Sequence, residues 1–79
     1  MPPLSKFKRF DVRKLISAGI EVLPEILKRV EALQPDDGLI LVAPFLPSPL
    51  IERLGANGFL SRVERGRGSD WLVYFWRES

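Results

Sequence analysis

Apolar and polar residues alternate along residues 7–13 with a period of two, which predicts a strand with one buried face. We expect Phe10 and Val12 to point into the core. Residues 14–21 show only a weak pattern and contain a glycine, so they are predicted to form a loop. This loop should lead directly into a helix.

A helix is predicted from about Pro24, where apolar residues begin to recur at spacings of three and four. Proline suits the first turn of a helix because its missing N–H needs no partner there. The stripe that should face the core consists of Leu23, Ile26, Leu27, Val30 and Leu33. The turn Pro35-Asp36-Asp37-Gly38 then ends the helix, and its glycine is expected to adopt a positive φ.

Residues 39–43 are apolar at every position, which indicates a strand with neighbours on both sides in a sheet. The first strand, the helix and this strand form a βαβ unit, whose strands should be parallel and joined by a right-handed crossover. After a proline-rich loop, Ser48 and Pro49 are predicted to be the N-cap and first turn of a second, shorter helix. Two more strands are expected at 59–65 and 71–77, joined by a glycine-rich hairpin.

The order of elements is therefore βαβαββ. Two helices cannot cover both faces of a sheet, so we expect an α+β fold, a two-layer α/β sandwich with both helices on one face of a mixed four-stranded sheet. The chain should be a single domain over residues 1–79, with an ordered core of about 6–78.

The last strand is apolar on both sides, so large residues should lie on the open face of the sheet. They are either Trp71, Val73 and Phe75 or Leu72, Tyr74 and Trp76. That face is either a partner surface or is covered by residues 14–21 or by the N-terminal residues.

Composition excludes most catalytic chemistry. The chain has no cysteine and no histidine, so it lacks a thiolate nucleophile, a disulfide and the commonest zinc ligands. No two carboxylates are placed by their spacing to share a pocket, and we expect that the protein is not an enzyme and holds no cofactor. The longest apolar run is far shorter than the roughly 18 residues of a membrane span, so we expect a soluble cytoplasmic protein without membrane attachment.

The net charge is +2, and basic residues gather near the start of the chain. These residues are Lys6, Lys8, Arg9, Arg13 and Lys14. They are either the charged side of an edge strand, which keeps sheets from pairing with one another, or a contact for a polyanion.

Several motifs together resemble the TusA/SirA-like superfamily, small bacterial proteins that carry sulfur on a cysteine just before the first helix. Their signature is Asp-x-Arg at the end of the first strand and Cys-Pro-x-Pro at the helix. Here Asp11-Val12-Arg13 matches the first part, and Leu23-Pro24-Glu25-Ile26 keeps one proline but no cysteine. The closer resemblance is to a cysteine-less bacterial branch of domains of unknown function, through Gly19, Pro44-Phe45-Leu46-Pro47-Ser48-Pro49-Leu50 and Gly58-Phe59. It covers nearly the whole chain and implies the same βαβαββ fold.

The missing cysteine excludes sulfur transfer by the family's mechanism, because Leu23 has no thiol for the helix N-terminus to activate. The resemblance therefore implies a non-catalytic module that binds a protein or small ligand or regulates one, in the context of sulfur or redox metabolism. The surface predicted to bind consists of Arg13, Leu23, Pro24, Glu25, Phe45, Pro47 and Ser48. In it, Arg13 either binds an anion or makes a local salt bridge, and Phe45 either shapes a contact loop or fills the core.

RNA binding is the second hypothesis. The βαβαββ order also resembles the C-terminal domain of a bacterial translation initiation factor that contacts RNA. The basic residues that could line one end of the sheet, near Trp71 and Tyr74, are Lys6, Lys8, Arg9, Arg62, Arg65 and Arg67. Ten acidic residues against twelve basic ones weaken this hypothesis, so a protein partner is the main expectation, with the chain itself a monomer or weak homodimer.

Overall fold

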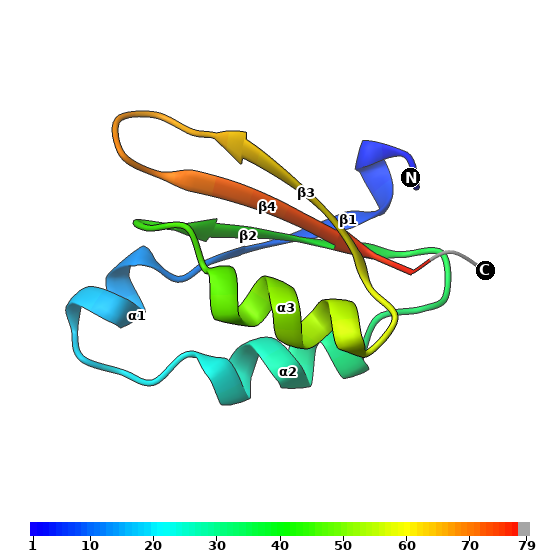
Figure 1. Ribbon diagram of the computed structural model, residues 1–79, viewed down its shortest axis with the longest axis horizontal. Coiled ribbons are helices and arrows are strands. Elements are labelled where there is room, and N and C mark those ends of the chain that lie inside the picture. Colours follow the sequence, from blue (N-terminus) through cyan, green and yellow to red (C-terminus); the bar gives the residue numbers. More distant parts are fainter. Residues whose placement is uncertain (78–79) are drawn as a thin grey trace.

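The computed structural model describes residues 1–77 and contains a mixed four-stranded sheet. Its strands are β1 (Phe7–Asp11), β2 (Gly38–Ala43), β3 (Leu60–Arg65) and β4 (Trp71–Trp76). They lie in the order β1-β2-β4-β3 (Figure 1), with β1 and β2 parallel and the other two pairs antiparallel. The predicted α+β class, the mixed sheet and the central place of β2 are thus confirmed. The predicted end of the domain, at residues 78 and 79, lies outside the described residues.

Three α-helices lie on one side of the sheet (Figure 1), where two were expected. They are α1 (Arg13–Ser17), α2 (Leu23–Glu31) and α3 (Ser48–Ala56), and a short 3-10 helix, η1 (Leu4–Lys6), precedes β1. The prediction of a loop at 14–21 is wrong, because α1 occupies the first half of that segment. Leu15 and Ile16 pack against the core, and this tertiary packing stabilises a helix too short to be stable alone.

The core lies between the helices and the sheet. Phe10 and Val12 are buried as predicted, although Val12 lies just beyond the end of β1. The stripe of α2 faces the core, where Ile26 and Val30 are buried and the other predicted members are partly buried. The fully buried side chains opposite them belong to the central strands and include Leu39, Leu41, Val73 and Phe75. Removal of this apolar surface from water is the main term that stabilises the fold.

The other face of β4 carries Leu72, Tyr74 and Trp76, which decides between the two sets that the sequence allowed. The ring of Phe7 packs edge-to-face on this side, with its centroid 5.4 Å from that of Tyr74 and 6.3 Å from that of Trp76. Residues 1–3 line a shallow hollow together with Trp76, and Trp76 is only 9% exposed. The N-terminal residues therefore cover one end of this face, whereas α1 packs on the helix side.

Two local predictions are wrong. The one for Gly38 is corrected by a contact with a residue distant in sequence, and the one for Ser48 by the observed start of the helix. Gly38 has no positive φ and is the first residue of β2; a Cβ there would clash with the ring of Phe7, which lies across it. Ser48 is the first helical residue of α3 and not its N-cap, which is Pro47, and no side chain caps this helix.

We expect Gly38→Ala to lower the free energy of unfolding by about 1–3 kcal/mol, because the new methyl group displaces the ring of Phe7 from its place against Tyr74. Urea unfolding followed by circular dichroism measures this. In a Phe7→Ala background the same change should be neutral or stabilising, since alanine is favoured over glycine in a strand by roughly 0.5–1 kcal/mol. Gly55→Ala is the control, because open space surrounds Gly55. An equal cost of Gly38→Ala in both backgrounds would show that the ring contact is not the cause.

Candidate functional site

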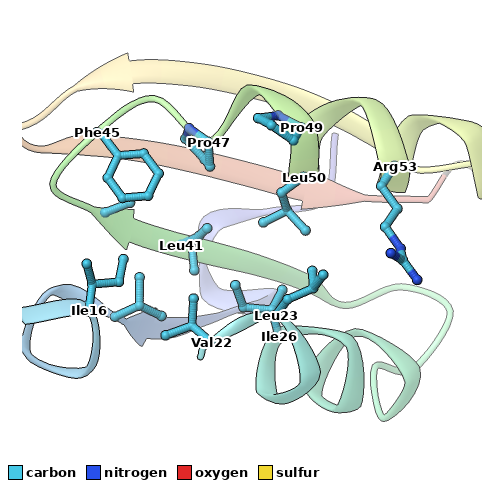
Figure 2. Close-up of a pocket in the computed structure, with 12 residues that line it drawn as sticks. Ile16, Val22, Leu23, Ile26, Leu41, Phe45, Pro47, Pro49, Leu50 and Arg53 are labelled. Atoms are coloured by element: carbon cyan, nitrogen blue, oxygen red, sulfur yellow. The ribbon is translucent and has the colours of Figure 1, made fainter. Parts of the chain in front are cut away.

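An apolar pocket of about 310 Å³ opens on the helix side of the sheet, between α2, α3 and the loop before α3 (Figure 2). This volume lies at the lower end of the range of ligand pockets, about 300–1,000 Å³. Eleven of its twelve lining residues are apolar. The lining consists of Val12, Ile16, Val22, Leu23, Ile26, Leu41, Ala43, Phe45, Pro47, Pro49, Leu50 and Arg53.

The pocket forms where β2 ends and α2 begins. Leu41 and Ala43 come from β2, and the proline-rich loop after that strand cannot continue the ladder, because proline donates no backbone hydrogen bond. The loop carries Phe45 and Pro47 past the end of the strand instead. The first turn of α2 contributes Leu23 from the other side, so a gap remains between two helix starts that no large side chain fills (Figure 2).

The two ends of the pocket differ in chemistry. Phe45 lies at one end and is 51% exposed, so it shapes the loop and does not fill the core. Arg53 lies at the other end (Figure 2) and is the single charged residue of the lining. Within residues 1–77, Arg53 makes no ion pair or side-chain hydrogen bond. An apolar pocket with one available guanidinium suits a ligand that has an apolar body and an anionic end.

The residues predicted from the sequence divide between this pocket and other places. Those that line the pocket are Leu23, Phe45 and Pro47. Those at the helix starts that lie outside the lining are Pro24, Glu25 and Ser48. Sequence reasoning missed Arg53, although it follows Leu50 by three residues and such spacing places two side chains on the same side of a helix.

Arg13 lies on the opposite side of the sheet from this pocket, against the predicted grouping. Its Nε and Nη2 donate hydrogen bonds to the two carboxylate oxygens of Asp11, at 2.9 and 2.6 Å, and its Nη1 donates to Asp70 at 2.5 Å. Of the two interpretations of Arg13, the structure supports the local salt bridge. The ion pair between Arg13 and Asp70 joins the end of β1 to the hairpin that precedes β4.

These hydrogen bonds change the acidity of both partners. Hydrogen bonding from the Arg13 side chain lowers the pKa of Asp11 from 3.8 to about 2, although partial burial opposes the shift. The hydrogen bond to Asp11, followed by that to Asp70, raises the pKa of Arg13 further above its usual range. Asp11 and Arg13 are therefore both charged throughout the neutral range, and with Asp70 they form a fixed structural clamp.

A separate hollow, of about 720 Å³, lies on the open face beside this clamp. Four arginines line it, together with Val42, Gly66, Asp70 and Leu72; the arginines are Arg9, Arg13, Arg65 and Arg67. The guanidinium of Arg65 lies 4.7 Å from the centre of the Trp71 ring, while Arg9 and Arg67 make no ion pair within residues 1–77. The structure thus brings together part of the basic set that was considered for RNA.

The other basic residues of that set have partners elsewhere. The Nζ of Lys6 lies 3.6 Å from the carboxylate of Asp36, and the Nζ of Lys8 lies 3.8 Å from that of Asp37. The two aspartates belong to the turn before β2. Arg62 lies 3.5 Å from Glu64 on its own strand.

In the part of the chain that the structure describes, no three histidine, cysteine, aspartate or glutamate side chains are placed to hold a metal ion. No helix in that part is long and apolar enough to span a bilayer.

We expect Asp11→Asn to destabilise the protein at about pH 6 but not near pH 2. A carboxylate whose pKa is lowered on folding stabilises the fold above its unfolded pKa, and this contribution is lost as the pH falls from about 4 toward 2. Because the side chains of Asp11 and Arg13 are 36% and 44% exposed, water screens the pair, and the free energy of unfolding at pH 6 should fall by less than about 1 kcal/mol. Urea unfolding at a series of pH values measures it. Glu52→Gln, at an exposed carboxylate outside the clamp, should leave stability nearly unchanged; a pH-independent effect of Asp11→Asn would exclude the ion pair as its cause.

Comparison with known proteins identifies the family. Residues 9–77 match the model of a family described as an uncharacterized conserved protein, DUF2249. No curated protein and no solved structure gives a significant match. The expected membership in a family of uncharacterised domains is confirmed, whereas the wider link to the TusA/SirA-like superfamily stays a prediction. Since the match covers most of the chain, the protein belongs to the DUF2249 family.

Proposed function

We propose that this protein is a non-catalytic binding module, and that its pocket on the helix side takes a small molecule or a partner's side-chain group with an apolar body and an anionic end. The observation that carries the proposal is the position of Arg53, the single charge in an otherwise apolar lining. Burial of apolar ligand surface contributes roughly 25 cal/mol per Å². Arg53 adds selectivity for a carboxylate or sulfonate over a neutral or cationic group.

The absence of catalysis in this proposal rests on the lining itself. Its side chains include no carboxylate, hydroxyl, imidazole or thiol that could act as nucleophile or general base. Arginine remains protonated at any pH that the protein tolerates, so Arg53 can bind an anion but cannot accept a proton. A ligand in this pocket is therefore held and released unchanged.

The proposal also includes the scaffold and its context. We place the protein among TusA/SirA-like modules of the bacterial cytoplasm, with a role in sulfur or redox metabolism that depends on binding. In the sulfur carriers, the cysteine stands at the position that corresponds to Leu23, and here Leu23 lines the pocket. On this proposal the site occupies the same position in the fold as the cysteine site of the sulfur carriers, and it binds a ligand in place of carrying sulfur covalently.

Octanoate tests this proposal, since it combines an eight-carbon chain with one carboxylate. We expect it to shift the amide signals of Leu23, Phe45 and Leu50 in two-dimensional NMR spectra, with saturation at millimolar concentrations. Arg53→Gln should weaken octanoate binding about three- to tenfold, the effect of one exposed charge-assisted contact. The neutral analogue 1-octanol should bind both proteins equally.

Lys28→Gln is the matched control, because it removes one positive charge from the exposed side of α2, outside the pocket. It should leave octanoate binding unchanged. Shifts that are spread over the whole surface, or an equal loss of affinity in Arg53→Gln and Lys28→Gln, would exclude the pocket as the site.

A second candidate function is binding of a nucleic-acid backbone in the arginine-lined hollow of the open face. The specific observation is the convergence of Arg9, Arg65 and Arg67, none of which has an acidic partner within the described residues. Phosphates would bind these guanidinium groups, and a neighbouring base could contact Leu72, which also lines the hollow.

A fluorescently labelled single-stranded RNA tests this second function by anisotropy. Binding should fall steeply with salt, and Arg67→Gln should reduce both the affinity and the steepness of the salt dependence, since one phosphate contact is removed. Lys14→Gln, a loss of the same charge on α1, should change neither. If no RNA binds at low salt, this function is excluded and the pocket proposal is unaffected.

A further inference from the structure

The edge strand β3 is charged at three of its six positions but has no proline, lysine or bulge to keep another strand from pairing with it. β3 is the terminal strand in the order β1-β2-β4-β3, and within residues 1–77 its outer edge has no partner strand (Figure 1). Its side chains are exposed except for the half-buried Glu64. Natural edges are commonly blunted by proline, lysine or a bulge. β3 contains neither residue, and its pairing with β4 is continuous from Leu60 to Arg65.

The backbone groups of alternate residues in β3 point toward this open edge. The N–H of Gly66 donates to the carbonyl of Asp70 at 2.9 Å, and these two residues continue the register that pairs Arg65 with Trp71. Hydrogen-bonded and non-hydrogen-bonded pairs alternate along antiparallel strands. The backbone groups of Leu60, Arg62 and Glu64 therefore face β4, and those of Ser61, Val63 and Arg65 face outward.

The side chains of β3 are complementary to their own sequence when it runs in the opposite direction. Val63 is 40% exposed and stands between Arg62 and Glu64. In an antiparallel pair of two β3 strands with a two-fold axis at Val63, Val63 lies opposite the partner's Val63 as a hydrogen-bonded pair. Arg62 then lies opposite the partner's Glu64, and Glu64 opposite the partner's Arg62. Both are non-hydrogen-bonded pairs, in which side chains come closest.

Neighbouring registers lack this complementarity. Moving the axis by one residue toward the start of β3 places Arg62 opposite the partner's Arg62, and moving it by one residue toward the end places Glu64 opposite the partner's Glu64. Like charges directly opposite each other are destabilising. The register centred on Val63 is thus selected over both neighbours by the same two residues.

We infer that β3 pairs with β3 of a second copy of this chain, antiparallel and centred on Val63, so that the two sheets form one continuous sheet. An interface of this kind is isologous, because the same residues contribute from both copies. It leaves the helix-side pocket of each copy open. A strand of six residues buries less surface than a standard stable interface, so the dimer forms reversibly and depends on protein concentration.

Charge reversal tests the pairing, with sedimentation velocity over a range of concentrations as the measurement. Arg62→Glu places like charges opposite each other at both positions, and so does Glu64→Arg; each variant alone should dimerise at least about tenfold more weakly than the wild type. An equimolar mixture of the two variants should dimerise again, because the two glutamates of one variant then lie opposite the two arginines of the other. Arg9→Glu, the same change on β1 at the opposite edge, should have no effect.

Hydrogen exchange gives a second measurement that needs no variant. At high protein concentration, exchange of the outward amides of Ser61, Val63 and Arg65 should slow, while that of Arg62 and Glu64, which already face β4, should not change. The inference is overturned if the wild type remains a monomer at all concentrations, if the mixed variants associate no better than each alone, or if the concentration-dependent protection lies elsewhere.

Discussion

Burial of β2 on both of its faces is the constraint on which the rest of the structure depends. Leu39 and Leu41 face the helices, and Val42 on the opposite face is only 2% exposed. A strand this apolar needs a neighbour at each edge and cover above and below. β1 and β4 provide the neighbours, and the helices cover one face. On the other face, Asp11 and Leu72 lie opposite Val42 on the two adjacent strands, where the Arg13 clamp begins.

Features that repeat along the chain could be predicted from the sequence, because every buried residue adds to the same pattern. The stripe of α2 and the apolar run of β2 are of this kind. Features that depend on a single contact between residues distant in sequence could not be predicted. The helix α1 exists because Leu15 and Ile16 reach the core, and Gly38 is required by the ring of Phe7 across the sheet. No local pattern contains either contact.

The candidate site was predictable to the extent that the topology determines it. The start of α2 and the end of β2 meet at the same edge of a βαβ unit, so Leu23, Phe45 and Pro47 were expected together and are found together. Arg13 was assigned to the wrong face, because the side chain of a residue just after a strand can turn to either side. On the open face it donates hydrogen bonds to Asp11 and also to Asp70 in the final hairpin, and sequence spacing does not link Asp70 to Asp11.

The chemistry around Leu23 explains why the proposed function is binding and not transfer. The N-terminal turn of α2 has no side-chain cap, so its free N–H groups remain, and such groups lower the pKa of a thiol placed there. The pocket beside them is apolar on every side except at Arg53, and apolar burial acts in the opposite direction on a thiol. A lining of this kind favours an apolar ligand over a reactive, water-exposed sulfur.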